Sequence, residues 1–484
     1  MRSLNPTPGL LHVPQGRELD FQIVGGCLLA AVAIATYPIA YLCIVVPAIL
    51  PLYQWLRAGA PGIPTLPIVA GLSVIYYAAP ALRGDLPTDD INLILSASLI
   101  VAGFLASAAV VYQFFLIAAA RRQRRRSNSS SDHDLVAELT VLGLGSGIAF
   151  YLAVFAGWFE GFGSYVGIVR AIALTFASIG CYLAGAARAD GVLRGPTWLV
   201  TVICIISLAL VSVGSLLLVG GIVNVVATVL GYVIAKRRVP WITLVLIFAV
   251  ISVLQAGKPT IRDKYWDADQ EVSPSQIPAI MAEWFGSGVD VLWSGEQQVD
   301  VLERASLLWT VIRVREMTPE AVPYLGGESY ALLPAYLVPR FIDPNKPKSQ
   351  TGLNLLAVRY GFQTEEGTER TTIAFGVIAE AFANFGNWGL LSVGAVFGAL
   401  CGIITWFSAG LPLLSVRMFV AIAATTVLLN VEADFAYLIV TMLQAVGAVL
   451  IAATVPVLAK SVFNAKPSVA AISPTTRRIT TAAE

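Results

Sequence analysis

The sequence predicts an all-α, polytopic integral membrane protein of about twelve transmembrane helices with one long, mostly helical outer loop. Hydrophobic residues make up 57% of the 484 residues, charged residues only 13%, and the mean hydropathy is +0.76. Soluble globular domains carry about 25% charged residues. The apolar residues gather in runs of roughly 20, the length a helix needs to cross a hydrocarbon core about 30 Å thick.

The expected spans form two groups, nine before one long polar segment and three after it. Proline breaks a helix and allows a tight turn, so we divide the first apolar run at Tyr37-Pro38. Glycines at four-residue spacing, Gly394, Gly398 and Gly402, predict close helix packing in the tenth span. The spans are expected near 21–37, 38–56, 64–82, 91–119, 135–158, 165–187, 196–214, 217–235, 239–256, 380–408, 413–430 and 435–458.

Basic residues predict the orientation of these spans, because short cytoplasmic loops retain lysine and arginine. In the short loops and tails, only Arg83 falls on the expected outer side. Both termini are therefore expected in the cytoplasm, and the first apolar run lacks the cleavage site of a signal peptide. The expected organisation is a cytoplasmic N-terminus at 1–20, a transmembrane bundle at 21–256 with a basic cytoplasmic linker at 120–134, an outer loop at 257–379, three spans within 380–458 and a polar, disordered cytoplasmic tail at 459–484.

Several kinds of chemistry are excluded from the outer loop by its composition. All five cysteines fall in expected spans, and both histidines fall on the cytoplasmic side. The loop therefore offers no disulfide, no thiolate nucleophile and no zinc site of the cysteine or histidine type. No acidic cluster has the spacing of metal ligands, so we expect neither a metal ion nor another cofactor. The arginine-rich segment 121–132 is expected to contact anionic lipids, and no nucleic-acid partner is expected.

Apolar residues at helical spacing predict a helix over 297–319, closed by Thr318-Pro319. Arg304 and Arg315 are eleven residues apart, which returns them to one face of that helix, about 16 Å apart along its axis. Arg313 is expected on the opposite face. Each arginine in the loop could instead pair with one of the loop's sixteen acidic residues.

A second helix is expected over 328–338, ending at Pro339. The segment after it, Arg340 to Lys348, is rich in turns and is stiffened by Pro344 and Pro347. Rigid cations beside a membrane suit phosphate binding, because guanidinium groups bind phosphate oxygens in pairs and lysine adds a point charge. Arg340 and Lys346 are therefore candidate phosphate ligands.

Charges within or at the edge of a span are costly and mark candidate functional sites. Arg170 lies inside the outer edge of the sixth span, and Glu380 opens the tenth span on the same side. Glu432 and Asp434 lie at the outer turn between the last two spans, where a solvated turn explains them equally well.

Four segments in this order resemble a known family, the bacterial oligosaccharide repeat-unit polymerases of the O-antigen polymerase (Wzy-type) superfamily. The resemblance covers roughly residues 240 to 410, and the N-terminal half is similar only in hydropathy. One departure is Phe382, where the family usually has tyrosine. In "REMTPEAVPYLG" (Arg315 to Gly326), ten residues separate the arginine from the glycine, and this spacing is also similar to one described for some members. The four segments are "GKPTIR" (257–262), "GGESY" (326–330), "PRFIDPNKP" (339–347) and "EAFANFGNWG" (380–389).

The resemblance implies a C-type, metal-independent membrane glycosyltransferase at the outer face of the bacterial inner membrane. Such an enzyme transfers a growing glycan from undecaprenyl diphosphate to a hydroxyl of the next lipid-linked repeat unit, which builds a cell-surface polysaccharide. The lipid-linked oligosaccharide is then both donor and acceptor, the bilayer surrounds the enzyme, and a chain-length regulator and a flippase are candidate partners. With the charges described above, the implied catalytic residues are Glu380, Arg340 and Arg304, and the implied ligands of the diphosphate or glycan are Arg170, Lys258, Arg262, Arg315, Glu328, Lys346 and Asn384.

Three other kinds of protein fit parts of the pattern. An O-antigen-ligase-type transferase is the nearest alternative, although its members usually offer an outer histidine that this chain lacks. A lipid-linked oligosaccharide flippase, a transporter, would show repeated bundles with charges spread through the spans. A non-catalytic partner in polysaccharide export would need no ordered cations at the membrane face.

Overall fold

The computed structural model describes residues 30–84, 86–124, 133–159, 161–162, 166–213, 218–236, 240–265, 276–294, 306–338, 340, 342–370 and 372–463. Within these ranges the chain is helical and forms no strand. Eight of the helices described there are long and apolar enough to cross a membrane, as expected of a polytopic membrane protein. They are Pro38–Arg57, Thr65–Arg83, Ile91–Arg124, Leu135–Phe155, Val169–Ala189, Gly195–Ser212, Val377–Ser408 and Phe435–Thr454.

Each of these eight helices coincides with an expected span. Three further apolar helices, Gly220–Lys236, Ile242–Lys258 and Val416–Leu428, match expected spans but are shorter. The expected first span, 21–37, lies largely outside the described residues. The total of twelve spans therefore remains a prediction.

The helices, in chain order, are α2 (Pro38–Arg57), α3 (Thr65–Ser73), the π-helix η1 (Val74–Ala78), α4 (Ala79–Arg83), α5 (Ile91–Arg124), α6 (His133–Phe155), α7 (Val166–Ala189), α8 (Gly195–Val213), α9 (Leu218–Lys236), α10 (Trp241–Tyr265), α11 (Ile277–Ser294), α13 (Leu307–Met317), the 3₁₀-helix η4 (Tyr330–Leu332), α14 (Leu333–Leu337), α15 (Thr351–Arg359), α16 (Gly367–Arg370), α17 (Val377–Ser408), α18 (Val416–Leu428) and α19 (Phe435–Phe463). The break predicted at Tyr37-Pro38 is confirmed, since α2 begins at Pro38. Proline suits a first helical position, where its missing N–H would have no helical partner.

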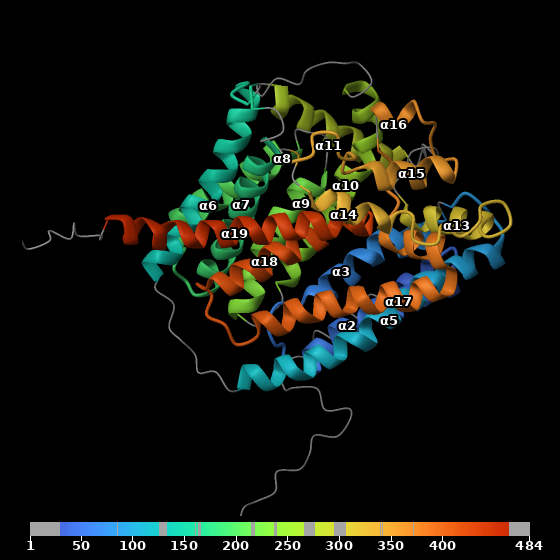
Figure 1. Ribbon diagram of the computed structural model, residues 1–484, viewed down its shortest axis with the longest axis horizontal. Helices are drawn as coiled ribbons and strands as arrows, with labels where there is room; N and C mark the ends of the chain where they lie inside the picture. Colours follow the sequence, from blue (N-terminus) through green and yellow to red (C-terminus); the bar gives the residue numbers. More distant parts are fainter. Residues whose placement is uncertain are drawn as a thin grey trace, which may run out of the picture.

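The long helices α5 and α17 run side by side in the lower part of Figure 1 and pack closely. Glycine allows this approach: a Cβ at Gly394 would lie 2.8 Å from the carbonyl oxygen of Phe104, and one at Gly398 would collide with that of Ala108. Residue numbers rise together along the contact, so the two helices are parallel. The close packing predicted from the glycine spacing is confirmed.

The bundle formed by α2, α5 and α17 has two different ends. At one end, the amide of Ile63 donates to Ser408 Oγ at 2.8 Å, and Arg122 donates to the carbonyl oxygen of Trp406 at 3.3 Å. At the other end, where α17 begins, helix α13 packs against α5 and α17 (Figure 1). The sequence predicts that the first, basic end faces the cytoplasm.

The helix of the ninth expected span is longer than that span. Helix α10 does not stop before residue 257 but continues to Tyr265, because α11 packs along its last turns. The indole of Trp284 donates to the carbonyl oxygen of Leu254 at 2.5 Å, and a Cβ at Gly257 would lie 2.5 Å from the carbonyl oxygen of Trp284. The tertiary contact with α11 thus extends the helix beyond its apolar part.

The two helices predicted in the outer loop are shorter than expected. Ser306 is extended and its hydroxyl accepts a hydrogen bond from the amide of Trp309, so α13 begins at Leu307 instead of residue 297. Its end at Thr318 is as predicted, but Arg304 lies outside the described residues and no single helix joins it to Arg315. The helix expected over 328–338 is divided into η4 and α14, and it ends in the extended Val338, since the residue before a proline disfavours the helical conformation.

Candidate functional site

Helix α17 is broken near its start by Gly386. The backbone of Gly386 has φ 57° and ψ −139°, a conformation essentially restricted to glycine. At a helix break, the carbonyl groups of the preceding turn lose the amide groups that would donate to them within the helix. These carbonyl groups bind the outer loop instead: Leu325 donates its amide to Ala383, and Gly326 donates to Asn384, both at 3.1 Å.

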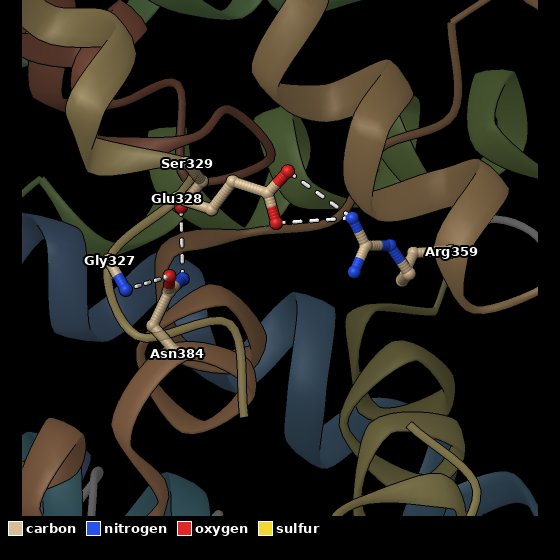
Figure 2. Close-up of polar contacts among 5 residues, drawn as sticks. All are labelled: Gly327, Glu328, Ser329, Arg359 and Asn384. Carbon is tan, nitrogen blue, oxygen red and sulfur yellow. Dashed lines mark hydrogen bonds and ion pairs between the residues drawn. The ribbon is translucent and has the colours of Figure 1, made fainter. Parts of the chain in front are cut away.

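The side chains of the same helical turns hold the glycine loop, which we define as residues 326–330. Asn384 Oδ1 accepts the amide of Gly327 at 3.0 Å, and its Nδ2 donates to Ser329 Oγ at 2.9 Å (Figure 2). Ser329 Oγ in turn donates to Glu380 Oε1 at 2.6 Å. Ser329, Glu380 and Asn384 are all buried. The first turns of α17 and the glycine loop therefore form one polar, buried unit.

Glu380 has both carboxylate oxygens engaged within the chain. Oε1 accepts from Ser329, and Oε2 accepts from the amide of Phe435 at 2.7 Å, which fixes the start of α19 to the start of α17. The side chain is fully buried. In this arrangement Glu380 positions the glycine loop, and its catalytic role remains a prediction.

Asp434 is a second buried carboxyl group beside this unit. It is 1% exposed, and its Oδ1 accepts from the amide of Tyr437 at 2.7 Å. Its Oδ2 has no hydrogen-bond partner in the part of the chain that the structure describes. The described ion pairs join no cation to Asp434 or Glu380. The solvated turn that the sequence allowed for Asp434 is wrong, because α15 and α19 enclose it.

Glu328, also in the glycine loop, points the other way. Its carboxylate oxygens lie 3.2 and 3.1 Å from Nη2 of Arg359, at the end of α15. Figure 2 shows the Glu328 side chain directed away from Asn384 and toward Arg359. Both partners are partly exposed, at 46% and 40%. Arg359 is absent from the predicted site, because no sequence spacing links it to Glu328, 31 residues earlier.

Arg340 and Lys346 differ in whether the charged group is already hydrogen-bonded within the described chain. Lys346 Nζ donates to the carbonyl oxygens of Tyr336 and Val338, at 2.9 and 2.7 Å, and so closes the end of α14. Burial, and to a smaller extent the charge of Arg340, lowers the pKa of Lys346, with Asp343 opposing. Arg340 makes no hydrogen bond or ion pair with any residue that the structure describes. The Asp343 carboxylate accepts from the amide of Asn345 instead.

The two arginines of α13 also differ. Arg313 donates to Glu316 at 2.9 Å and to the carbonyl oxygen of Tyr360 at 3.4 Å, so it is a structural residue. Arg315 is partly exposed and has no ion pair or hydrogen bond to the described ranges. The pairing of Arg304 and Arg315 on one continuous helical face is wrong, because Ser306 starts the helix between them.

The other predicted ligands lie on helices away from the glycine loop in sequence and structure. Arg170 is exposed in α7, and Lys258 is half-buried in the last part of α10, against α11. The backbone of Arg262 belongs to the same helix, but its side chain lies outside the described residues. Among the described side chains, no three histidine, cysteine, aspartate or glutamate residues gather as metal ligands.

Comparison with family models, with curated proteins and with solved structures finds no match to this chain. The family resemblance drawn from the sequence motifs therefore remains a prediction. The geometry adds a separate fact: the "GGESY" and "EAFANFGNWG" segments, far apart in the chain, bind each other directly.

Proposed function

We propose that this protein is a membrane glycosyltransferase that polymerises undecaprenyl-diphosphate-linked oligosaccharide repeat units at the outer face of a bacterial inner membrane. The observation that carries the proposal is the buried contact between Ser329 of the glycine loop and Glu380 and Asn384 of α17. Two of the four segments that resemble the polymerase family thus meet at one end of a membrane bundle.

The arginines of the segment between α11 and α17 suit a diphosphate leaving group. Arg340 and Arg315 are partly exposed guanidinium groups without partners in the described chain, and Arg359 is held in one orientation by Glu328. During transfer the acceptor oxygen bonds to the anomeric carbon, the bond from that carbon to the phosphate oxygen breaks, and the lipid diphosphate leaves with the electron pair. Fixed guanidinium groups stabilise the negative charge that develops on the leaving group.

Elongation by the purified protein tests this proposal. The full-length chain is reconstituted in liposomes and incubated with repeat units on undecaprenyl diphosphate, extracted from source cells that lack the gene. Wild-type protein is expected to give a ladder of glycan lengths on a gel. Arg340→Lys keeps the charge but loses the paired donors, and is expected to reduce the ladder substantially. Arg313→Lys, on a structural arginine, is the matched control and should retain elongation.

Two outcomes would overturn the proposal. Wild-type protein that moves a finished glycan to a different acceptor without lengthening it would be a ligase. Wild-type protein that moves lipid-linked units across the bilayer without joining them would be a transporter.

A further inference from the structure

Asp434 Oδ2 stands out among the carboxylate oxygens near the glycine loop. Asp434 is 1% exposed and its Oδ1 accepts from Tyr437, whereas Oδ2 makes no well-formed hydrogen bond in the described chain, although the backbone amide of Leu353 lies near the carboxyl group. A buried acceptor without a well-aligned donor destabilises the folded state. Glu380 contrasts with it, because both of its oxygens are occupied.

A second unpartnered polar atom lies close by. The hydroxyl of Tyr330 is buried and has no hydrogen-bond partner among the described residues. The Tyr330 ring stacks on Phe385 and meets Phe435 edge-on, each with centroids 5.8 Å apart. Burial and the nearby carboxyl groups of Glu380 and Asp434 raise the pKa of Tyr330, so its hydroxyl keeps its proton. A hydrogen-bond donor and an acceptor are therefore both available beside the glycine loop.

These groups have the chemistry that binds a sugar hydroxyl. A hydroxyl donates one hydrogen bond and accepts others, so it can donate to Asp434 Oδ2 and accept from Tyr330. The surrounding aromatic rings suit the apolar faces of a sugar. No cation of the described chain pairs with Asp434, which leaves the carboxyl group able to take up a proton.

Resting on the proposed function, we propose that Asp434 is the general base of glycosyl transfer. Oδ2 accepts the proton of the acceptor hydroxyl while that oxygen bonds to the anomeric carbon of the donor. The bond from that carbon to the diphosphate breaks at the same time, and the lipid diphosphate leaves with the bonding electrons. The proton is later released from Asp434 to water.

Gly352 lies directly against this oxygen. A Cβ at Gly352 would stand 3.0 Å from Asp434 Oδ2, and the amide of Gly352 donates to the hydroxyl of Tyr336 at 3.0 Å. The first turn of α15 thus covers the base, and it must move aside for a sugar to reach it.

The test compares Asp434→Asn with wild type in the reconstituted elongation assay, using the same repeat units on undecaprenyl diphosphate. Asparagine is also a good helix N-cap, so it keeps the Oδ1 contact to α19 and changes only the ability to take a proton. The expected result is a kcat lower by about 10²–10⁴-fold with KM changed less than about threefold, and a thermal midpoint close to wild type. Asp434→Glu is expected to recover part of kcat.

The pH profile separates a base from a merely structural residue. Wild-type kcat/KM is expected to rise with pH as Asp434 loses its proton, and this acidic limb should vanish in Asp434→Asn and return in Asp434→Glu. The titratable groups that face Asp434 are Glu380, Tyr330 and Tyr336. Glu432→Gln, which alters the other carboxyl group of the same turn, is the matched control and should keep the wild-type profile.

The outcomes distinguish this inference from the proposed function. Wild-type elongation with an equally active Asp434→Asn would overturn the role of Asp434 alone. Loss of kcat together with a lower thermal midpoint and an unchanged pH profile would also overturn it, in favour of a structural role. Absence of elongation by wild type would overturn the proposed function itself.

Discussion

Ser329 donates a hydrogen bond of 2.6 Å to Oε1 of Glu380, a residue 51 positions later in the chain, and both side chains are buried. The other oxygen of Glu380 accepts from Phe435 at the start of α19. One carboxylate thus joins the glycine loop to the starts of α17 and α19. Hydrogen bonds to a charged acceptor are stronger than neutral ones, so the loop and the helix ends are held as one unit.

Removing the Ser329 hydroxyl should loosen this unit. Ser329→Ala leaves one oxygen of Glu380 and one donor of Asn384 without a partner, at a cost of about 1–3 kcal/mol. We expect a lower thermal midpoint in detergent and a loss of elongation. Ser392→Ala is the control, because among the described residues the Ser392 hydroxyl bonds only to the carbonyl oxygen of Trp388 in its own helix. Equal midpoints for the two variants would contradict the role of Ser329.

Glu380→Gln tests the carboxylate side of the same contact. The amide of glutamine can accept from Ser329 but would present N–H donors to the amide of Phe435. We expect the protein to insert in the membrane and to leave single repeat units without polymer. Gel analysis of surface glycan from cells that carry the variant measures this, and chain lengths like those of wild type would refute a required role.

The break in α17 depends on Gly386. An alanine there would be strained at φ 57°, at a cost of about 1–3 kcal/mol, and its Cβ would lie 2.8 Å from the hydroxyl of Tyr324. Gly386→Ala should therefore lower the thermal midpoint and disrupt binding of the glycine loop. At Gly145, inside α6, no described atom lies within 4 Å of an added Cβ. Gly145→Ala is expected to be neutral or slightly stabilising.

The exposed pair of Glu328 and Arg359 should matter more for activity than for stability. Partly exposed ion pairs contribute about 0–1 kcal/mol, so Glu328→Gln is expected to leave the thermal midpoint near wild type. It should raise KM for the lipid-linked donor, because Arg359 loses its fixed orientation. Glu316→Gln breaks the comparable pair with Arg313 and serves as control. Full recovery of KM in the charge-swapped Glu328→Arg, Arg359→Glu double variant would assign the pair to the fold.

Alanine substitutions of Lys346 and Arg340 should affect different properties, stability for Lys346 and elongation for Arg340. Lys346→Ala removes a donor from two carbonyl groups at the end of α14, so we expect a lower thermal midpoint. Arg340→Ala removes no described hydrogen bond, so its midpoint should stay near wild type while elongation falls. Thermal unfolding and elongation measured on the same samples check both, and a stability loss for Arg340→Ala would place that side chain in the fold.

Stability should depend on pH through Asp434. Burial raises the pKa of this carboxyl group to about 6, with backbone amide donors opposing the shift. Because the folded state holds the proton more tightly than the unfolded state, the contribution to stability is present at low pH and is lost as pH rises through that value. The thermal midpoint should fall between about pH 4 and about pH 7, and fall less in Asp434→Asn. An identical decrease in the variant would assign the titration to another group.

The sequence by itself determined the features that depend on neighbouring residues. Apolar runs located the helices, Pro38 and Thr318 marked helix ends, and the spacing of Gly394 and Gly398 identified a close helix contact. These features are local because helix formation depends on backbone conformation and on residues three or four positions apart. Glu380 and Asn384 also stood out, as polar residues at the start of a span.

Only the tertiary structure decided the partners of those polar residues. It joined Glu380 to Ser329 and Phe435, paired Glu328 with Arg359, used Lys346 to close α14 and enclosed Asp434. A hydrogen bond requires two groups within about 3 Å in the right direction, and side chains 31 to 55 residues apart reach that geometry only after the helices have packed. The sequence therefore indicated which charged and polar residues are candidates for a functional site. Helix packing decided which of them are bound to partners within the protein.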